Sequence, residues 1–356
     1  MDLSQRGATW IIAAGVIAAG LYFLREPLTQ FALALLLWLA IDGLAETLDK
    51  RLHFLPRLAA LPVALVIVLG LVALIGFVVV TNISAMSADF TRYETRLNNV
   101  IAEIYMQLGI AGQIPTFYDL IARLNPQDVA RQVGASLQNL ASDIMFILLY
   151  LAFLFPAAGL MTKKLDFIFG SGRQREQARD VFRRIRVSME QYLWVQTVIS
   201  LIITGLTYAT LLIAGLENAL FWSFVIFFLN YIPTIGSIVA VVVVTAVALV
   251  QFTSLPHIFG VFLATSAWQF LIGNFVQPRM TGDSLNLSAV VVLLALAIWG
   301  AMWGIAGAFL AAPLTVMLMI VLAQFPTTLW IAILLSQDGK PTPTTAPLIK
   351  SEAGPN

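Results

Sequence analysis

The sequence predicts an all-α polytopic membrane protein with about eight transmembrane segments. Of its 356 residues, 60% are hydrophobic and only 11% are charged. The apolar residues gather in runs that each approach or exceed the roughly 20 residues needed by a membrane-spanning helix. Two long runs are interrupted by proline or glycine, and one polar stretch separates the first spans from the others. We therefore expect two broken or re-entrant helical hairpins and an extracytoplasmic helical insert.

The composition argues against several functional classes. The absence of cysteine excludes disulfides, thiolate metal sites and cysteine nucleophiles. His53 and His257 each stand alone in the sequence, so we expect no metal site. The basic residues are confined to a few loops, which argues against a nucleic-acid partner. The chain has neither a phosphate-binding loop nor a catalytic dyad within a span, so we expect no enzyme activity, no catalytic residues and no cofactor.

The N-terminal region, residues 1–80, contains three predicted spans. Pro27 suits the first turn of the second helix, where no amide donor is missed. The loop from Glu46 to Arg57 is basic, which places it and the N-terminus in the cytoplasm. The three spans are Ala8–Leu24, Leu28–Leu44 and Leu58–Val80.

Residues 81–143 are predicted to form the extracytoplasmic amphipathic insert. Apolar residues recur at steps of three and four from Ile83 to Leu108, which indicates a helix. A second helix is expected to begin at Asn125-Pro126, a cap residue followed by proline. Long apolar stripes need a partner, so the insert either packs on itself or provides a surface for self-association in a homo-oligomer. Residues 144–162 form the fourth span.

Residues 163–190 are predicted to form a basic cytoplasmic helix that lies in the plane of the lipid headgroups. This segment carries the densest basic cluster in the chain. A helix with such a basic face is attracted to anionic membrane lipid. The candidate headgroup contacts on one side of it are Arg175, Arg179, Arg183 and Arg186.

The first broken hairpin is predicted in the core region, residues 191–325. A plain span, Tyr192–Ala214, precedes a run from Ala219 to Val250 that has no charged side chain. The run is too long for one upright helix and too short for two. One further span separates it from a loop containing Arg279, which we place in the cytoplasm. The run must then enter and leave on the same side, with its turn between Pro233 and Gly236.

The second broken hairpin is predicted from Ala289 to Gln324. Both of its ends are expected in the cytoplasm, so it opens opposite to the first hairpin. Opposed hairpins are similar to the inverted arrangements of secondary transporters. Residues 326–356 form the C-terminal end, and the polar tail from Ser336 is predicted to be a disordered cytoplasmic segment.

The two breaks provide the candidate functional residues. Irregular backbone at membrane depth is tolerated only inside protein or along a watery cavity. The candidate hinge or gate residues are Pro233, Gly236, Gly300, Gly304, Gly307 and Pro313. The candidate substrate-path residues are Asn230, Tyr231, Thr234, Ser237, Gln269 and Asn274. The alternative is structural: the Pro-x-x-Gly break only ends one helix, and the glycines of the second run let helices approach closely.

Three stretches together resemble the autoinducer-2 exporter family of bacterial membrane proteins. They are YIPTIGSI, NFVQPRMTGDSLNLS and VVLLALAIWGAMWGIAGAFLAAPL, all in the C-terminal half. The chain departs from the family at Gln277-Pro278-Arg279, where an acid-proline pair is common. The resemblance implies export of small polar molecules and assembly as a homo-oligomer. It also implies an inner-membrane location, and ion-for-proton exchange has been assigned to some relatives.

The hypothesis from the sequence is a secondary transporter that exports a small polar solute across the bacterial inner membrane. The solute would be an autoinducer-2-like signal or a related metabolite, with a cation or proton as a coupling partner. One alternative is a sodium or lithium/proton antiporter, although no carboxylate lies deep in a predicted span. Another is an oligomeric membrane scaffold that does not transport.

Overall fold

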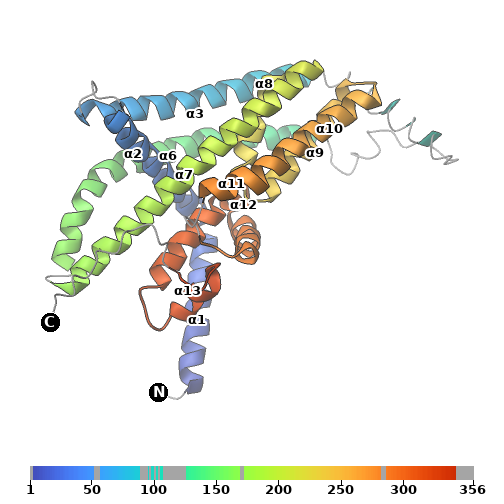
Figure 1. Ribbon diagram of the computed structural model, residues 1–356. Coiled ribbons are helices and arrows are strands. Elements are labelled where there is room, and N and C mark those ends of the chain that lie inside the picture. The colour runs from blue at the N-terminus through green and yellow to red at the C-terminus, as the bar shows by residue number, and fades with distance from the viewer. Residues whose placement is uncertain are drawn as a thin grey trace, which may run out of the picture. The chain divides into compact units, whose positions relative to one another are not determined.

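A computed structural model describes residues 3–51, 57–88, 126–168, 172–281 and 286–341, with isolated positions between 95 and 106. Within these residues every regular element is helical (Figure 1). Among the described residues, six helices are long and apolar enough to cross a membrane: residues 25–49, 59–78, 142–161, 175–214, 255–280 and 289–322. The predicted all-helical class is therefore confirmed. Most of the predicted insert, residues 81–143, lies outside the described residues.

The chain divides into two compact units, each built from separated segments. One unit comprises Met1–Gly43, Met145–Val195 and Thr281–Asn356, and the other comprises Leu44–Ile144 and Gln196–Met280. Each unit is therefore described by itself.

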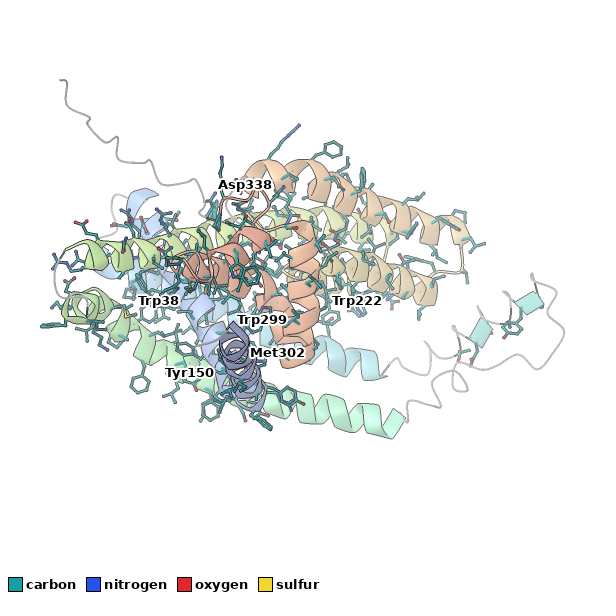
Figure 2. The ribbon with its side chains drawn as sticks, turned by 90° about the horizontal axis from the view of Figure 1, so that it is seen from below. Trp38, Tyr150, Trp222, Trp299, Met302 and Asp338 are labelled. Atoms are coloured by element: carbon teal, nitrogen blue, oxygen red, sulfur yellow. The ribbon has the colours of Figure 1, made fainter. Side chains whose placement is uncertain are left out.

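The first unit is built from helices at both ends of the chain and in its middle. Its elements are α1 (Leu3–Phe23), the first part of α2 (Arg25–Arg51), the later part of α6 (Pro126–Ile168), the first part of α7 (Arg173–Ala214), α12 (Ala289–Leu322) and α13 (Leu329–Leu335). Tyr150 of α6 packs edge-on against Phe31 of α2, with ring centroids 5.6 Å apart (Figure 2). Helix α6 begins at Pro126, where the sequence predicts a helix start.

Helix α7 joins two segments that the sequence analysis separates. The predicted interfacial helix ends at residue 190 and the next span begins at Tyr192, whereas α7 is continuous from Arg173 to Ala214. The physical reason is that neither glycine nor proline occurs between Arg173 and Thr204, so the change from charged to apolar residues brings no helix breaker. The predicted boundary has no counterpart in the structure.

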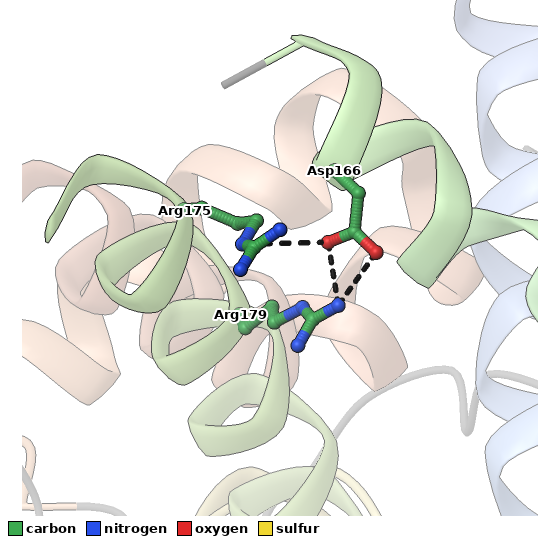
Figure 3. Close-up of polar contacts among 3 residues, drawn as sticks. All are labelled: Asp166, Arg175 and Arg179. Atoms are coloured by element: carbon green, nitrogen blue, oxygen red, sulfur yellow. Dashed lines mark hydrogen bonds and ion pairs between the residues drawn. The ribbon is translucent and has the colours of Figure 1, made fainter. Parts of the chain in front are cut away.

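The four arginines predicted to meet lipid headgroups all contact carboxylates of the chain. Arg179 Nη2 donates to both carboxylate oxygens of Asp166, at 2.5 and 2.6 Å, and Arg175 Nε lies 3.9 Å from the same side chain (Figure 3). The other contacts join Arg183 to Asp180 at 2.8 Å, and Arg186 to Glu190 at 2.7 Å and to Asp42. Ion pairing within the chain thus competes with any contact to lipid.

We expect Asp166→Asn to lower the free energy of unfolding by up to about 1 kcal/mol at low salt, because partly exposed pairs contribute little. Since exposed pairs are screened, the difference from the parent chain should disappear in 1 M NaCl. Thermal unfolding of the purified protein at both salt concentrations checks this. Asp180→Asn is the control, because its pair with Arg183 is more exposed. A stability difference between Asp166→Asn and the parent chain that persists in 1 M NaCl would contradict a stabilising role for the partly exposed ion pairs of Asp166.

The segment after α13 is bound back to the start of α12. Asn286 Nδ2 donates to Asp338 Oδ1 at 2.8 Å and to the Lys340 carbonyl oxygen at 2.6 Å, and the Gln337 N–H donates to the Asn286 carbonyl at 3.0 Å. Asp338 is labelled in Figure 2. The Lys340 backbone N–H holds the pKa of the Asp338 carboxyl below its usual range. Residues 336–341 are therefore ordered, contrary to the predicted disordered tail, whose remainder lies outside the described residues.

The second unit contains the first break and the helices around it. Its elements are α3 (Arg57–Ala88), the later part of α7, α8 (Ala219–Leu229), α9 (Ile235–Gln251), α10 (Leu255–Leu271), a π-helical turn (Ile272–Val276) and α11 (Gln277–Thr281). Helix α9 packs against both α8 and α10 (Figure 1). The buried positions of α9, Gly236, Ala240, Val244 and Ala248, are small at every fourth residue. Small side chains let neighbouring helices approach closely.

Candidate site at the first helix break

The first break is a tight turn over residues 230–234 that joins α8 to α9. Thr234 has φ 61° and ψ −55°, which is an outlier for a β-branched residue. Gly236 lies against the end of α8, since a Cβ atom there would be 1.7 Å from the Leu229 carbonyl oxygen. The backbone is thus strained and closely packed at this point, and strain of this kind is often found at functional sites.

Three buried amide side chains meet at the turn, and we call Gln196, Asn230 and Gln269 the amide cluster. Gln196 Nε2 donates to the Asn230 carbonyl oxygen at 2.6 Å, and Gln269 Nε2 donates to Asn230 Oδ1 at 3.1 Å. The exposed fractions of the three residues are 6%, 8% and 8%. Beside the cluster, the hydroxyls of Tyr231 and Thr197 are 2.7 Å apart. These bonds tie α7 and α10 to the turn.

The amide cluster leaves one polar atom unsatisfied. Asn230 Nδ2 is buried and has no hydrogen-bond partner among the described residues. An unpaired buried donor costs about 1–3 kcal/mol, so this N–H group is available to an acceptor from outside the chain. The cluster carries no ionisable acid or base, and the described residues contain no group of three or more His, Asp or Glu side chains able to hold a metal ion. The chemistry available here is hydrogen bonding to a polar group.

The structure brings only part of the predicted substrate path together. Asn230, Tyr231 and Gln269 lie at the turn. Thr234 belongs to the turn, but its side chain is exposed. Ser237 donates to the Thr234 carbonyl at 2.8 Å, and Asn274 donates to the Phe270 carbonyl at 2.9 Å. Local backbone bonds satisfy Ser237 and Asn274, so nothing draws them toward the amide cluster.

Helix α7 supplies two residues of the site that are not among the predicted substrate-path residues. Gln196 and Thr197 lie in a segment interpreted as a plain span, yet both contact the turn 34 positions further along the chain. A signal is present, because polar residues recur at three- and four-residue steps along this span. They are Gln196, Ser200, Thr204 and Thr207. That spacing places them near one face of a helix.

The second break lies within α12, in the other unit. Gly304 has φ 64° and ψ −143°, so the helix is interrupted there. Trp299 Nε1 donates to Thr315 Oγ1 at 3.3 Å across 16 positions, which a straight helix would separate by about 24 Å. The two arms therefore fold back on each other, with Trp299 on the first arm (Figure 2).

The candidate gate residues have different roles at this second break. Gly304 provides the bend, and Gly307 provides the close approach, because a Cβ atom there would be 1.9 Å from the Trp299 carbonyl oxygen. Gly300 has only an ordinary neighbour, the Cβ of Ala308 at 3.9 Å, and Pro313 is buried in the second arm. Trp303 Nε1 also donates to the Leu21 carbonyl of α1 at 3.1 Å.

The helices and breaks define a multi-pass α-helical membrane protein with polar side chains buried inside a helical unit. Residues 11–327 match the model of the AI-2E family transporter, and the chain belongs to this family. The resemblance seen in the sequence is thus confirmed, and the membership supports a role as a membrane transporter.

Two relatives match over most of their length. The chain is 28% identical over 330 residues to "AI-2 transport protein TqsA" of Escherichia coli K12, covering 91% of this chain and 94% of that protein. It is 27% identical over 342 residues to a Haemophilus influenzae protein named "Putative transport protein", with the same shares covered.

Proposed function

We propose that the chain is a secondary transporter that exports a small polar solute across the bacterial inner membrane, along a path beside the amide cluster. The observation that carries this proposal is the unpaired Asn230 Nδ2 at the meeting point of three buried amides. Polar side chains buried in membrane proteins commonly mark substrate pathways. A solute acceptor group would satisfy the Asn230 donor, while Gln269 holds the other end of the same amide.

The solute in this proposal is an autoinducer-2-like signal or a related metabolite, which the name of the Escherichia coli relative supports. The amide cluster favours a solute path over a cation/proton antiporter, because amides neither titrate nor carry charge. The two helix breaks would be gates, and both termini would lie in the cytoplasm. Coupling to a cation or proton, assembly into a homo-oligomer and contact with lipid headgroups belong to the same proposal.

Asn230→Leu is expected to reduce solute flux at least about tenfold, since it removes both hydrogen-bonding groups of the side chain and keeps the number and branching of its heavy atoms. Hydrogen bonds contribute about 0.5–1.5 kcal/mol each, and 1.4 kcal/mol is a factor of ten. The measurement is efflux of autoinducer-2 from proteoliposomes that contain the purified protein.

Ser223→Ala is the matched control, because that buried hydroxyl donates to the Ala219 carbonyl of its own helix at 2.7 Å. Its flux should stay within about twofold of the parent chain, since only a local bond is lost. Equal flux through the parent chain and Asn230→Leu would reject the path. If autoinducer-2 left proteoliposomes containing the parent chain no faster than protein-free liposomes, autoinducer-2 would be rejected as the solute.

A further inference from the structure

The second helix break is held differently at its two ends. Helix α12 folds back on itself at Gly304, and we call its two arms, Ala289–Trp303 and Ile305–Leu322, the α12 hairpin. The bend at Gly304 is the tip of this hairpin. Its base is formed by the segment that precedes α12 and by the segment that closes α13. All these parts belong to one compact unit of the chain, together with α1.

The base of the α12 hairpin is fastened by four hydrogen bonds. They join residues 286–288, before α12, to residues 335–340, at the end of α13 and after it, which we call the strap. Two of these bonds join backbone groups, at 3.0 and 3.1 Å, and the other two are donated by the Asn286 amide, at 2.6 and 2.8 Å. Asn286 has φ 44°, a conformation that asparagine adopts more readily than most residues. The strap therefore closes the base with both backbone and side-chain bonds.

The tip of the hairpin is held by one hydrogen bond to another helix, among the residues that the structure describes. Trp303 Nε1 donates to the Leu21 carbonyl of α1 at 3.1 Å, and α12 packs against α1. Trp299 lies beside Trp303, with ring centroids 4.9 Å apart, but its own N–H is bonded to Thr315 within the hairpin. Ile305, which follows the bend, is 83% exposed. A single side-chain bond thus ties the tip to α1.

The Leu21 carbonyl can accept this bond because the helical ladder is interrupted where α1 meets α2. The Leu24 N–H donates to the Gly20 carbonyl at 2.9 Å, and α1 ends at that point. Carbonyls in the last turn of a helix have no partner within the helix. Pro27 has no N–H, so α2 cannot continue the ladder of α1 without a gap. The indole N–H of Trp303 supplies a donor to one carbonyl of this corner.

The two ends of the hairpin therefore differ in how much must break before they separate. Release of the base requires four hydrogen bonds to break, two of them between backbone groups. Release of the tip requires only the bond from Trp303 to Leu21 to break. Parts of a protein with the fewest contacts open first, and elements that gate a site are drawn from such parts.

We propose that the α12 hairpin is a gate that opens at its tip, with the strap as its fixed end and the bond from Trp303 to the Leu21 carbonyl as its latch. At 1.5 Å per residue the arms are about 22 and 27 Å long, so each is shorter than the roughly 30 Å core of a bilayer. A tip that enters from one side then stays at membrane depth. This inference rests on the proposed function, in which the second break is a gate, and it adds the end that moves and the residue that holds it.

The test is the distance between two spin labels, measured by double electron–electron resonance on the full-length protein in liposomes. Ile305→Cys labels the tip and Phe23→Cys labels the corner, because these side chains are 83% and 82% exposed and the chain has no native cysteine. Co-expression with an excess of the cysteine-free parent chain keeps distances between copies out of the signal. We expect a main population at a short distance and a minor one at a longer distance.

Trp303→Phe keeps an aromatic ring beside Trp299 and removes the N–H of the latch. The ratio of the longer-distance to the shorter-distance population should rise about fivefold, the equivalent of one hydrogen bond. Trp299→Phe is the matched control, because the bond that it loses, to Thr315, lies within the hairpin. It should keep the ratio of the labelled parent. An unchanged ratio in Trp303→Phe, or an equal rise in both variants, would overturn the latch.

Asn286→Gly tests the fixed end of the gate. Glycine accepts the positive φ of this position, so the variant removes the two side-chain bonds of the base and leaves its two backbone bonds. The distance between tip and corner should remain that of the labelled parent. A rise in the longer-distance population as large as that in Trp303→Phe would show that the hairpin is released from its base, and would overturn the strap as the fixed end.

The outcomes separate this inference from the proposed function, because the spin-label distance is measured without a solute. Loss of flux in Asn230→Leu, with an unchanged distance ratio in Trp303→Phe, keeps the path and rejects the latch. A raised ratio in Trp303→Phe alone, with flux unaltered in Asn230→Leu, keeps the latch and rejects the path.

Discussion

Gly236→Ala is expected to cause one of the two largest losses of stability from a single methyl group in this chain. The added Cβ would lie 1.7 Å from the Leu229 carbonyl oxygen, which belongs to the backbone and cannot rotate away. The turn must open to make room, and this shifts Asn230 away from Gln196 and Gln269. Overpacking of this kind costs about 3 kcal/mol. The midpoint temperature of thermal unfolding and the yield of monodisperse protein should both fall.

Gly260→Ala is the control for this prediction. Gly260 lies within α10, and a Cβ atom there would meet nothing within 4 Å. Alanine in a helix interior is more favourable than glycine by roughly 0.5–1 kcal/mol, so this variant should be at least as stable as the parent chain. If Gly236→Ala unfolded at the same temperature as Gly260→Ala, the close approach of Gly236 to the Leu229 carbonyl at the first break would be contradicted.

Gly307→Ala is expected to have a comparable effect at the second break. The added Cβ would lie 1.9 Å from the Trp299 carbonyl oxygen and 2.8 Å from Trp303 Cβ. The two arms of α12 must separate, which breaks the bond from Trp299 to Thr315 and disturbs the Trp299 and Trp303 rings, whose centroids are 4.9 Å apart. We expect a loss of about 3 kcal/mol in the free energy of unfolding and a weaker near-ultraviolet circular dichroism signal.

Gly300→Ala tests whether position matters or only the loss of a glycine. Its added Cβ would make ordinary contact with Ala308 at 3.9 Å. The unfolding midpoint and the near-ultraviolet signal should then stay close to those of the parent chain. Similar losses in both variants would show that the helix arms do not approach at Gly307.

The helix breaks are the part of the site that the sequence predicts best. Proline and glycine impose local backbone requirements, so Pro233, Gly236 and Gly304 can be recognised without knowledge of the fold. The sequence also predicts the opening of α6 at Pro126, again from a local cap pattern.

The residues that meet at the site are harder to predict, because their contacts are long-range. Gln196 and Asn230 are 34 positions apart, and Gln269 is a further 39 positions along the chain. Only packing of α7 and α10 against the turn brings them together. Ser237 and Asn274 are polar as well, but each donates to a backbone carbonyl three or four positions earlier.

The arginines illustrate the same limit for charged groups. Their spacing on one side of a helix suggests a membrane-facing surface, but the acids that pair with them come from elsewhere. Asp166 lies 13 positions before Arg179, on α6 rather than on α7, and Asp42 comes from α2. Composition along a single helix cannot identify such partners.

The most direct test of the solute path is the reaction of Asn230→Cys with N-ethylmaleimide in membrane vesicles. The chain has no native cysteine, so the introduced thiol is the only target. Alkylation requires the thiolate, and a thiol in dry apolar surroundings does not ionise readily. Thr245→Cys, at a position bonded within its own helix, is the unreactive control. We predict rapid labelling at position 230 in these vesicles; labelling as slow as at position 245 would mean that the turn is dry and packed, and it would contradict the path.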